Sequence, residues 1–197
     1  MKYFASRNLI ILVVIVVSGC VVSFKQQYPS EWEKLNTIPG RCPDISGIFS
    51  NTGELTPSEK ERTQKSNWDT SLTGALLVKV EDGIQDASHV EIIQTDIGEV
   101  TVTAWDGSKP LIQQVFSISK KDFTCESGFI EFAPEEECVA AEGTMGCVFG
   151  KRLFTKDISG ALILKTTARA FLLLPVPATF SQWDWYRFEP FNKHEND

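Results

Sequence analysis

Apolar and polar side chains alternate with a period of two through most of the later part of the chain, and this alternation limits the folds that the chain can adopt. In the segment EVTVTAWDG, residues 99–107, an extended backbone puts Val100, Val102 and Ala104 on one side. The Asp-Ile-Gly before this segment and the Asp-Gly that ends it are typical of hairpin turns, because glycine accepts the positive φ that such turns need. The pattern therefore predicts antiparallel strands joined by short turns.

Similar segments recur about every 8–12 residues, which is the spacing of strands in all-β domains. They read HVEIIQT, QQVFSIS, DFTCES, GFIEFAP, CVFGKRLFT, GALILKTTARA and QWDWYRFEP. We expect a mainly β fold, an antiparallel meander that forms a barrel, a half-barrel or a sandwich, because closure removes exposed strand edges. FLLLPVP, residues 171–177, is expected to be a linker or an edge segment, since proline cannot occupy a central strand.

One or two short helices are expected near residues 57–78. Thr56-Pro57-Ser58-Glu59 combines a capping hydroxyl, a proline at the first helical position and a glutamate three residues after the cap. Trp68, Leu72 and Leu76 then recur at the spacing of one helical face.

Residues 1–19 have the three zones of a secretory signal peptide. Two basic residues make a positive start, the apolar run 9–17 follows, and Ser18-Gly19 puts small side chains where a peptidase must fit. A membrane-spanning helix needs roughly 20 apolar residues, and this run is shorter. An uncleaved N-terminal anchor and an ordinary signal in which Cys20 is incidental are the two alternatives.

The residues Val17-Ser18-Gly19-Cys20 resemble the lipobox of bacterial lipoproteins, an aliphatic residue and two small ones before an invariant cysteine. The resemblance implies that the Cys20 thiol is diacylglycerylated, that residues 1–19 are removed, and that the new amino group receives an acyl chain such as palmitate. Two or more acyl chains make a stable membrane anchor, at ~0.8 kcal/mol for each buried CH₂. The resemblance also implies the bacterial cell envelope, and Val21, where an aspartate would favour the inner membrane, favours the outer membrane.

Composition and the positions of proline residues indicate how the rest of the chain is divided. Residues 20–40 are polar and mixed and contain two prolines, so we expect a lipidated N-terminus and a flexible tether there. Within it, one helical turn at Trp32 and Leu35 and packing of these residues on the domain are both left open by the sequence. A single β-rich domain is expected over residues 41–191, and a polar tail over residues 192–197.

The net charge of the chain limits the classes of partner that it can bind. Lys and Arg number 19 against 26 Asp and Glu, a formal net charge of −7. Nucleic acid requires clustered Lys and Arg, so no nucleic-acid partner is expected. The acidic balance also disfavours flat docking on an anionic bilayer, and we expect the membrane to be contacted through the lipid and not through the protein surface.

Four cysteines remain once Cys20 is set aside, and an even number in an exported chain favours disulfides. Four cysteines allow three pairings. Cys138 and Cys147 are separated by a glycine-containing segment that closes easily, so we expect this pair, which leaves Cys42 with Cys125. Loop-closure entropy predicts stabilisation of about 3 kcal/mol for the first pair and about 4–5 kcal/mol for the second.

Few residues are candidates for catalysis or metal binding. The chain's two histidines are His89, on an expected strand, and His194, in the polar tail, and no C-x-x-C pair is present for zinc. Motifs for a nucleophilic serine, a zinc protease or a phosphate-binding loop are absent from the sequence. Glu135–Glu137 are expected in a solvated loop. We therefore expect no enzyme activity, metal or cofactor, with a carboxylate-dependent hydrolase as a less favoured alternative.

Residues 45–49 suit a first strand. Gly47-x-Phe49 in that segment and Arg187 in the last expected strand resemble a lipocalin pattern, in which a Gly-x-Trp packs against a late arginine at one end of the barrel. Phe49 stands where that family has tryptophan. The resemblance implies packing of Gly47 and Phe49 against Arg187 and a carrier of a small apolar ligand. CPDISGIFSN and FTCESGFIEF are also similar to small β-rich bacterial lipoproteins of unassigned activity.

Taken with the lack of catalytic groups, the anchor signal indicates a non-enzymatic envelope lipoprotein that binds a protein partner or has a structural role. The lipocalin-like carrier is the alternative.

Overall fold

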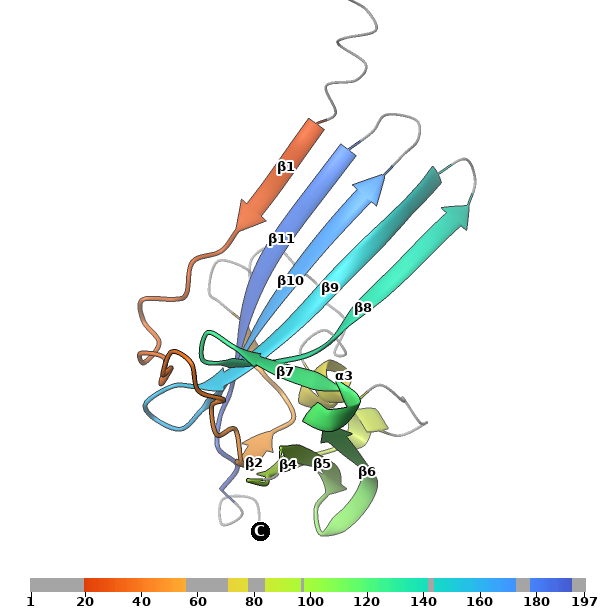
Figure 1. Cartoon of the computed structure of the whole chain (residues 1–197). Helices are drawn as coiled ribbons and strands as arrows, with labels where there is room; N and C mark the ends of the chain where they lie inside the picture. The colour runs from red at the N-terminus through yellow and green to blue at the C-terminus, as the bar shows by residue number, and fades with distance from the viewer. Residues whose placement is uncertain are drawn as a thin grey trace, which may run out of the picture. The chain divides into compact units, whose positions relative to one another are not determined.

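The computed structural model describes residues 20–55, 71–77, 84–96, 98–141, 144–172 and 178–192. These residues are mainly β, as the alternation predicts, and form two sheets (Figure 1). The strands are β1 (Cys20–Lys25), β2 (Gly47–Ser50), β3 (Glu54–Leu55), β4 (His89–Gln94), β5 (Glu99–Asp106), β6 (Lys109–Ser117), β7 (Phe123–Glu126), β8 (Phe129–Ala141), β9 (Thr144–Lys156), β10 (Leu162–Leu172) and β11 (Ala178–Phe188). The helical segments are α3 (Leu72–Leu76) and the 3-10 turns η2 (Ile84–Asp86) and η3 (Ile118–Lys120).

The chain divides into two compact units, and the single domain expected over residues 41–191 stays a prediction. Unit 1 comprises the residues up to Gln26 together with residues 134–150 and 167–183. Unit 2 comprises residues 27–133, 151–166 and 184–197. Strands β8 to β11 are long enough to contribute residues to both units.

Unit 2 contains the four-stranded sheet, in which β2, β4, β5 and β6 pair antiparallel in that order. The side of β5 that the sequence predicted to be apolar faces the core, since Val100, Val102 and Ala104 are fully buried. Gly98, in the turn before β5, has a φ of +79°, a conformation that favours glycine. Large aromatic side chains fill the core of the unit, among them Phe49, Phe123, Phe154 and Phe188.

Helix α3 confirms part of the helical prediction. Leu72 and Leu76 lie one turn apart and are buried, and Ser71 caps the helix by accepting a hydrogen bond from the Gly74 amide at 3.1 Å. The expected helix start at Thr56–Glu59 lies outside the described residues, as does Trp68.

In unit 1, β1 pairs in parallel with β11, and the paired segments are Cys20–Lys25 and residues 178–183 (Figure 1). The strand order then continues through β10, β9 and β8. The first six residues of the segment 20–40, expected to be a tether, thus belong to a sheet. The two segments are far apart in the sequence, so no local pattern indicates that they pair.

Strand β8 corrects a second prediction. Glu135–Glu137, expected in a solvated loop, lie within β8, and β9 begins only three residues after β8 ends. Most of the segment that separates Cys138 from Cys147 is therefore strand instead of loop. Three adjacent glutamates are not typical of a strand. The strand forms because β8 pairs with β9, which supplies backbone hydrogen bonds that the local sequence does not indicate.

Some expectations fall on residues that the structure does not describe. These are the signal peptide at residues 1–19, the prolines Pro175 and Pro177, and His194. Over the described part of the chain, no helix has the length and apolar character needed to cross a membrane. In the same part of the chain neither strand order returns to its first strand, so both sheets are open.

Candidate functional site

The structure contains the two disulfides that the sequence suggested. Cys42 pairs with Cys125 in unit 2, where the bond connects the loop before β2 to β7. Cys138 pairs with Cys147 in unit 1, where the bond connects the neighbouring strands β8 and β9. Cys20 is the first residue of β1, and its backbone lies opposite that of Ala178. Two disulfides fit an oxidising compartment.

The residues of the lipocalin-like pattern lie on β2 and β11. The Phe49 ring is buried and covers Gly47, where an added Cβ would lie 2.7 Å from the ring. The Arg187 guanidinium forms ion pairs with Asp157 and with Glu189. The described contacts of Arg187 are thus with polar groups, and its packing against Phe49 stays a prediction.

Asp157, at the end of β9, is the centre of this polar cluster and is 1% exposed. Its Oδ1 accepts hydrogen bonds from the Ser159 amide at 2.9 Å, the Ser159 hydroxyl at 2.6 Å and the Ala161 amide at 3.0 Å. Its Oδ2 accepts a hydrogen bond from Arg187 Nε at 3.1 Å. Asp157 therefore ties the turn after β9 to β11 within unit 2, which is a structural role.

The chain that follows β1 also packs on unit 2. The Tyr28 ring lies 5.1 Å from that of Trp185 and 5.8 Å from that of Trp32, and Leu35 forms a β-bridge with Asp157. Burial and the charge of Asp157 raise the pKa of Tyr28 to about 12, so the phenol stays protonated at neutral pH. Of the two arrangements that the sequence left open for Leu35, the bridge to Asp157 is packing on the domain.

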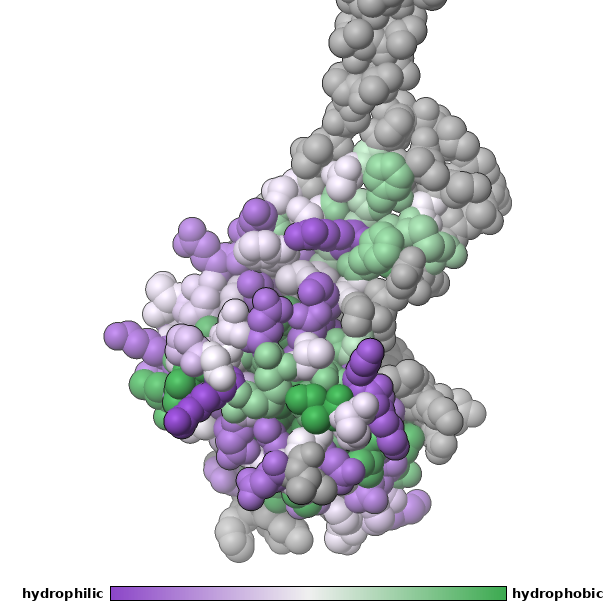
Figure 2. Space-filling view, in the orientation of Figure 1, coloured by the Kyte–Doolittle hydropathy of each residue, from purple (hydrophilic) through white to green (hydrophobic). Residues whose placement is uncertain are grey.

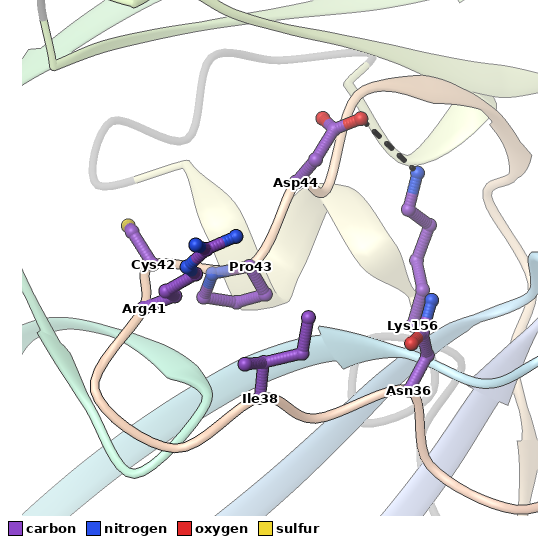
Figure 3. A pocket seen from close by; sticks show the side chains of 7 residues that line it. All are labelled: Asn36, Ile38, Arg41, Cys42, Pro43, Asp44 and Lys156. Atoms are coloured by element: carbon purple, nitrogen blue, oxygen red, sulfur yellow. Dashed lines mark ion pairs between the residues drawn. The ribbon is translucent and has the colours of Figure 1, made fainter.

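A polar pocket of about 300 Å³ lies in unit 2 beside the disulfide of Cys42 (Figure 3). Lys156 Nζ donates a hydrogen bond to the Ser46 carbonyl at 3.0 Å and lies 3.8 Å from Asp44. Burial acts to raise the pKa of Asp44, but hydrogen bonds with Ser46 and the charge of Lys156 outweigh burial and lower that pKa. The pocket is lined by Asn36, Ile38, Arg41, Cys42, Pro43, Asp44 and Lys156.

This lining carries two cationic groups and one carboxylate, so it suits a small anion better than an apolar ligand. A second depression of about 490 Å³ shares Cys42 and Asp44 and is otherwise lined mainly by polar residues of unit 2. Neither depression contains an imidazole or a free thiol. Over the described residues, no three His, Cys, Asp or Glu side chains come together as a metal site.

The four-stranded sheet has an outer face, on the side opposite the core, that carries exposed aliphatic residues. Ile48 is 43% exposed, Ile93 is 49% exposed and Val115 is 51% exposed. The strand register puts them on one side of the sheet, because Ile48 pairs with Glu91, two residues from Ile93, and Ile93 and Val115 both pair with Thr101. The outer face consists of Ile48, Glu91, Ile93, Thr101, Thr103, Gln113 and Val115.

The polar side chains of the outer face bond to one another or to its border. Trp105 Nε1 donates a hydrogen bond to Glu91 Oε2 at 3.2 Å, and Gln113 Nε2 donates one to Thr103 Oγ1 at 3.1 Å. At the border, His89 lies on β4 as predicted, and its ring stacks on that of Phe191 at 4.3 Å. The aliphatic side chains are consequently the part of the face best suited to a partner.

Sequence reasoning did not identify the outer face, although one signal was present. HVEIIQT has isoleucine at two successive positions, so one of them must face away from the core of a two-layered fold. Ile92 is 1% exposed, and Ile93 is the residue left outside.

Comparison with known proteins adds no assignment: no protein-family model, curated protein or solved structure matches this chain.

Proposed function

We propose that the protein is a non-enzymatic lipoprotein of the bacterial cell envelope, anchored through Cys20, whose unit 2 binds a protein partner through the outer face. The anchor is supported by the signal-like residues 1–19 and by the lipobox-like residues before Cys20. The two disulfides fit export from the cytoplasm. The outer membrane is the favoured location because Val21 follows the cysteine.

The observation that carries the binding role is the exposure of Ile48, Ile93 and Val115 on one side of a sheet. Aliphatic side chains on the solvent side of an antiparallel sheet are unusual, since that side is ordinarily polar. Glu91 bonds to Trp105, and Glu99 lies on the same side of β5 at the end of the strand. The three aliphatic side chains therefore fit an apolar patch on a protein partner.

The alternative carrier of a small apolar ligand has less support. The interior of unit 2 holds large buried aromatic side chains, among them Phe49, Phe123, Phe154 and Phe188. The two depressions of unit 2 described above are lined mainly by polar groups. A hydrolase has no specific observation in its favour.

Photo-crosslinking in living cells tests the binding role. A photoreactive phenylalanine at position 93 is expected to form an adduct with one envelope protein, because Ile93 is exposed within the outer face. Val115→Asp should lower the adduct yield at least about tenfold, since a charge is then buried in an apolar contact. Ile158→Asp is the matched control, because Ile158 is 62% exposed and lies in the turn after β9.

The expected result is loss of the adduct with Val115→Asp and its retention with Ile158→Asp. No adduct at position 93, or equal loss with both substitutions, contradicts the binding role. An adduct of twice the protein's mass identifies a second copy as the partner and contradicts binding to a different protein.

A further inference from the structure

No described residue of unit 1 belongs to the buried hydrophobic core. Among the residues of unit 1 whose burial the structure describes, the sole buried one is Gly146. A sheet ordinarily buries one face against another layer, so the exposed face of these described residues is open to a contact outside the chain. In the view of Figure 2, apolar side chains are exposed over this part of the sheet.

Exposed aromatic residues concentrate in unit 1. Phe24, Phe149 and Phe171 are 48%, 44% and 44% exposed, and they are the phenylalanines among the exposed large apolar residues of the described chain. They come from β1, β9 and β10, so three of the strands contribute. Single exposed apolar residues are ordinary, whereas a contiguous apolar patch indicates an interaction site, so the question is which of these rings lie together.

Strands β1 and β11 carry Phe24, Phe180 and Gln182 on one face, and Ser23, Lys25, Ser181 and Trp183 on the other. The rings of Phe24 and Phe180 lie 5.7 Å apart on one side, which we call the aromatic face. On the other side the Ser181 hydroxyl donates a hydrogen bond to Ser23 at 2.9 Å. The Lys25 ammonium also lies on that side, 4.8 Å from the centre of the Trp183 ring. The paired segments CVVSFK and ATFSQW hold one charged residue, Lys25.

The aromatic face lies next to the proposed anchor. Cys20 begins β1 and lies opposite Ala178, so no spacer separates the lipidated residue from the sheet. At about 3.3 Å per residue, Phe180 is about 7 Å and Phe24 about 13 Å along the strands from the level of Cys20. A lipid inserted in the bilayer raises the effective concentration of these side chains at the interface, so even weak partitioning suffices to hold them there.

We infer that the aromatic face of β1 and β11 lies on the leaflet that holds the lipid anchor. The inference rests on the proposed lipidation of Cys20. It replaces the expectation of a domain raised on a tether with a sheet that begins at the membrane surface. The acidic balance of the whole chain does not oppose this placement, because the paired segments contain no acidic residue.

Lipid crosslinking from two adjacent positions tests the inference. The lipidated protein is reconstituted into vesicles of phosphatidylethanolamine and phosphatidylglycerol, with a photoreactive phenylalanine at position 180. Position 179 is the matched control, because Thr179 is exposed and the alternation of the strand puts it on the opposite face. We expect phospholipid adducts at position 180 to exceed those at position 179 about tenfold, and Phe24→Ser to lower the yield at position 180 severalfold.

Each outcome bears on a separate claim. Equal phospholipid labelling at the two positions, or adducts at position 180 with protein only, overturns the inference and leaves the lipid anchor intact. A chain without lipid at Cys20 overturns the anchor and the inference together. Intact mass checks that the Cys138–Cys147 disulfide persists in each variant, and the comparison of positions 180 and 179 requires no substitution at Phe24.

Discussion

Replacing Cys42 and Cys125 together by alanine is expected to lower the free energy of unfolding by about 4–5 kcal/mol, measured by urea denaturation of the mature chain. The two residues are separated by 83 positions, so the bond removes a long loop from the unfolded ensemble. The bond also fastens the loop before β2 to β7, next to the polar pocket. Its loss should therefore be among the largest single effects on the stability of unit 2.

The second disulfide supplies the matched control for this experiment. Cys138 and Cys147 are separated by 9 positions, and loop-closure entropy predicts a smaller cost, about 3 kcal/mol, when both are replaced by alanine. An equal loss for the two pairs, or a loss below about 2 kcal/mol for the long loop, contradicts the entropic explanation.

Asp157→Ala is expected to cost about 3–5 kcal/mol of stability in the same assay. The substitution leaves the buried amides of Ser159 and Ala161 without their acceptor and breaks the ion pair with Arg187. A buried polar group that loses its hydrogen-bond partner is not compensated for the loss of water, so the loss of stability exceeds that from removing a surface charge.

Two further substitutions separate the roles of the Asp157 carboxylate. Asp157→Asn keeps an acceptor for the amides but removes the charge that faces Arg187. Its free energy of unfolding should therefore lie between that of the original chain and that of Asp157→Ala. Asp44→Ala removes a carboxylate whose side chain is 73% exposed and should cost less than about 1 kcal/mol. Similar losses for Asp44→Ala and Asp157→Ala would refute a special role for the buried cluster.

The strands that the sequence predicts well are those with local, one-sided patterns. In β5 Val100, Val102 and Ala104 are fully buried as the alternation predicts, although Thr103 between them is buried too, and glycine marks the turn that precedes the strand. The pairing of the cysteines also follows from local information, because Cys138 and Cys147 are close in sequence. Helix α3 is predicted by the spacing of its buried leucines.

The features that the sequence does not predict depend on contacts between distant segments. Residues 20–25 form a short segment without regular alternation, and they pair with β11, more than 150 positions away. The bond between Asp157 and Arg187 spans 30 positions and two strands. To identify the outer face, the register of four strands must be known, and the sequence of no single segment gives it.

The state of Cys20 decides whether the protein is a lipoprotein. Mass spectrometry of the full-length precursor, expressed in a bacterium and extracted from its membranes with detergent, measures that state directly. We predict a chain that begins at Cys20, lacks residues 1–19 and carries a diacylglyceryl group on the thiol and an acyl chain on the amino group. A chain that retains residues 1–19 with an unmodified Cys20 contradicts the anchor and the membrane placement of β1.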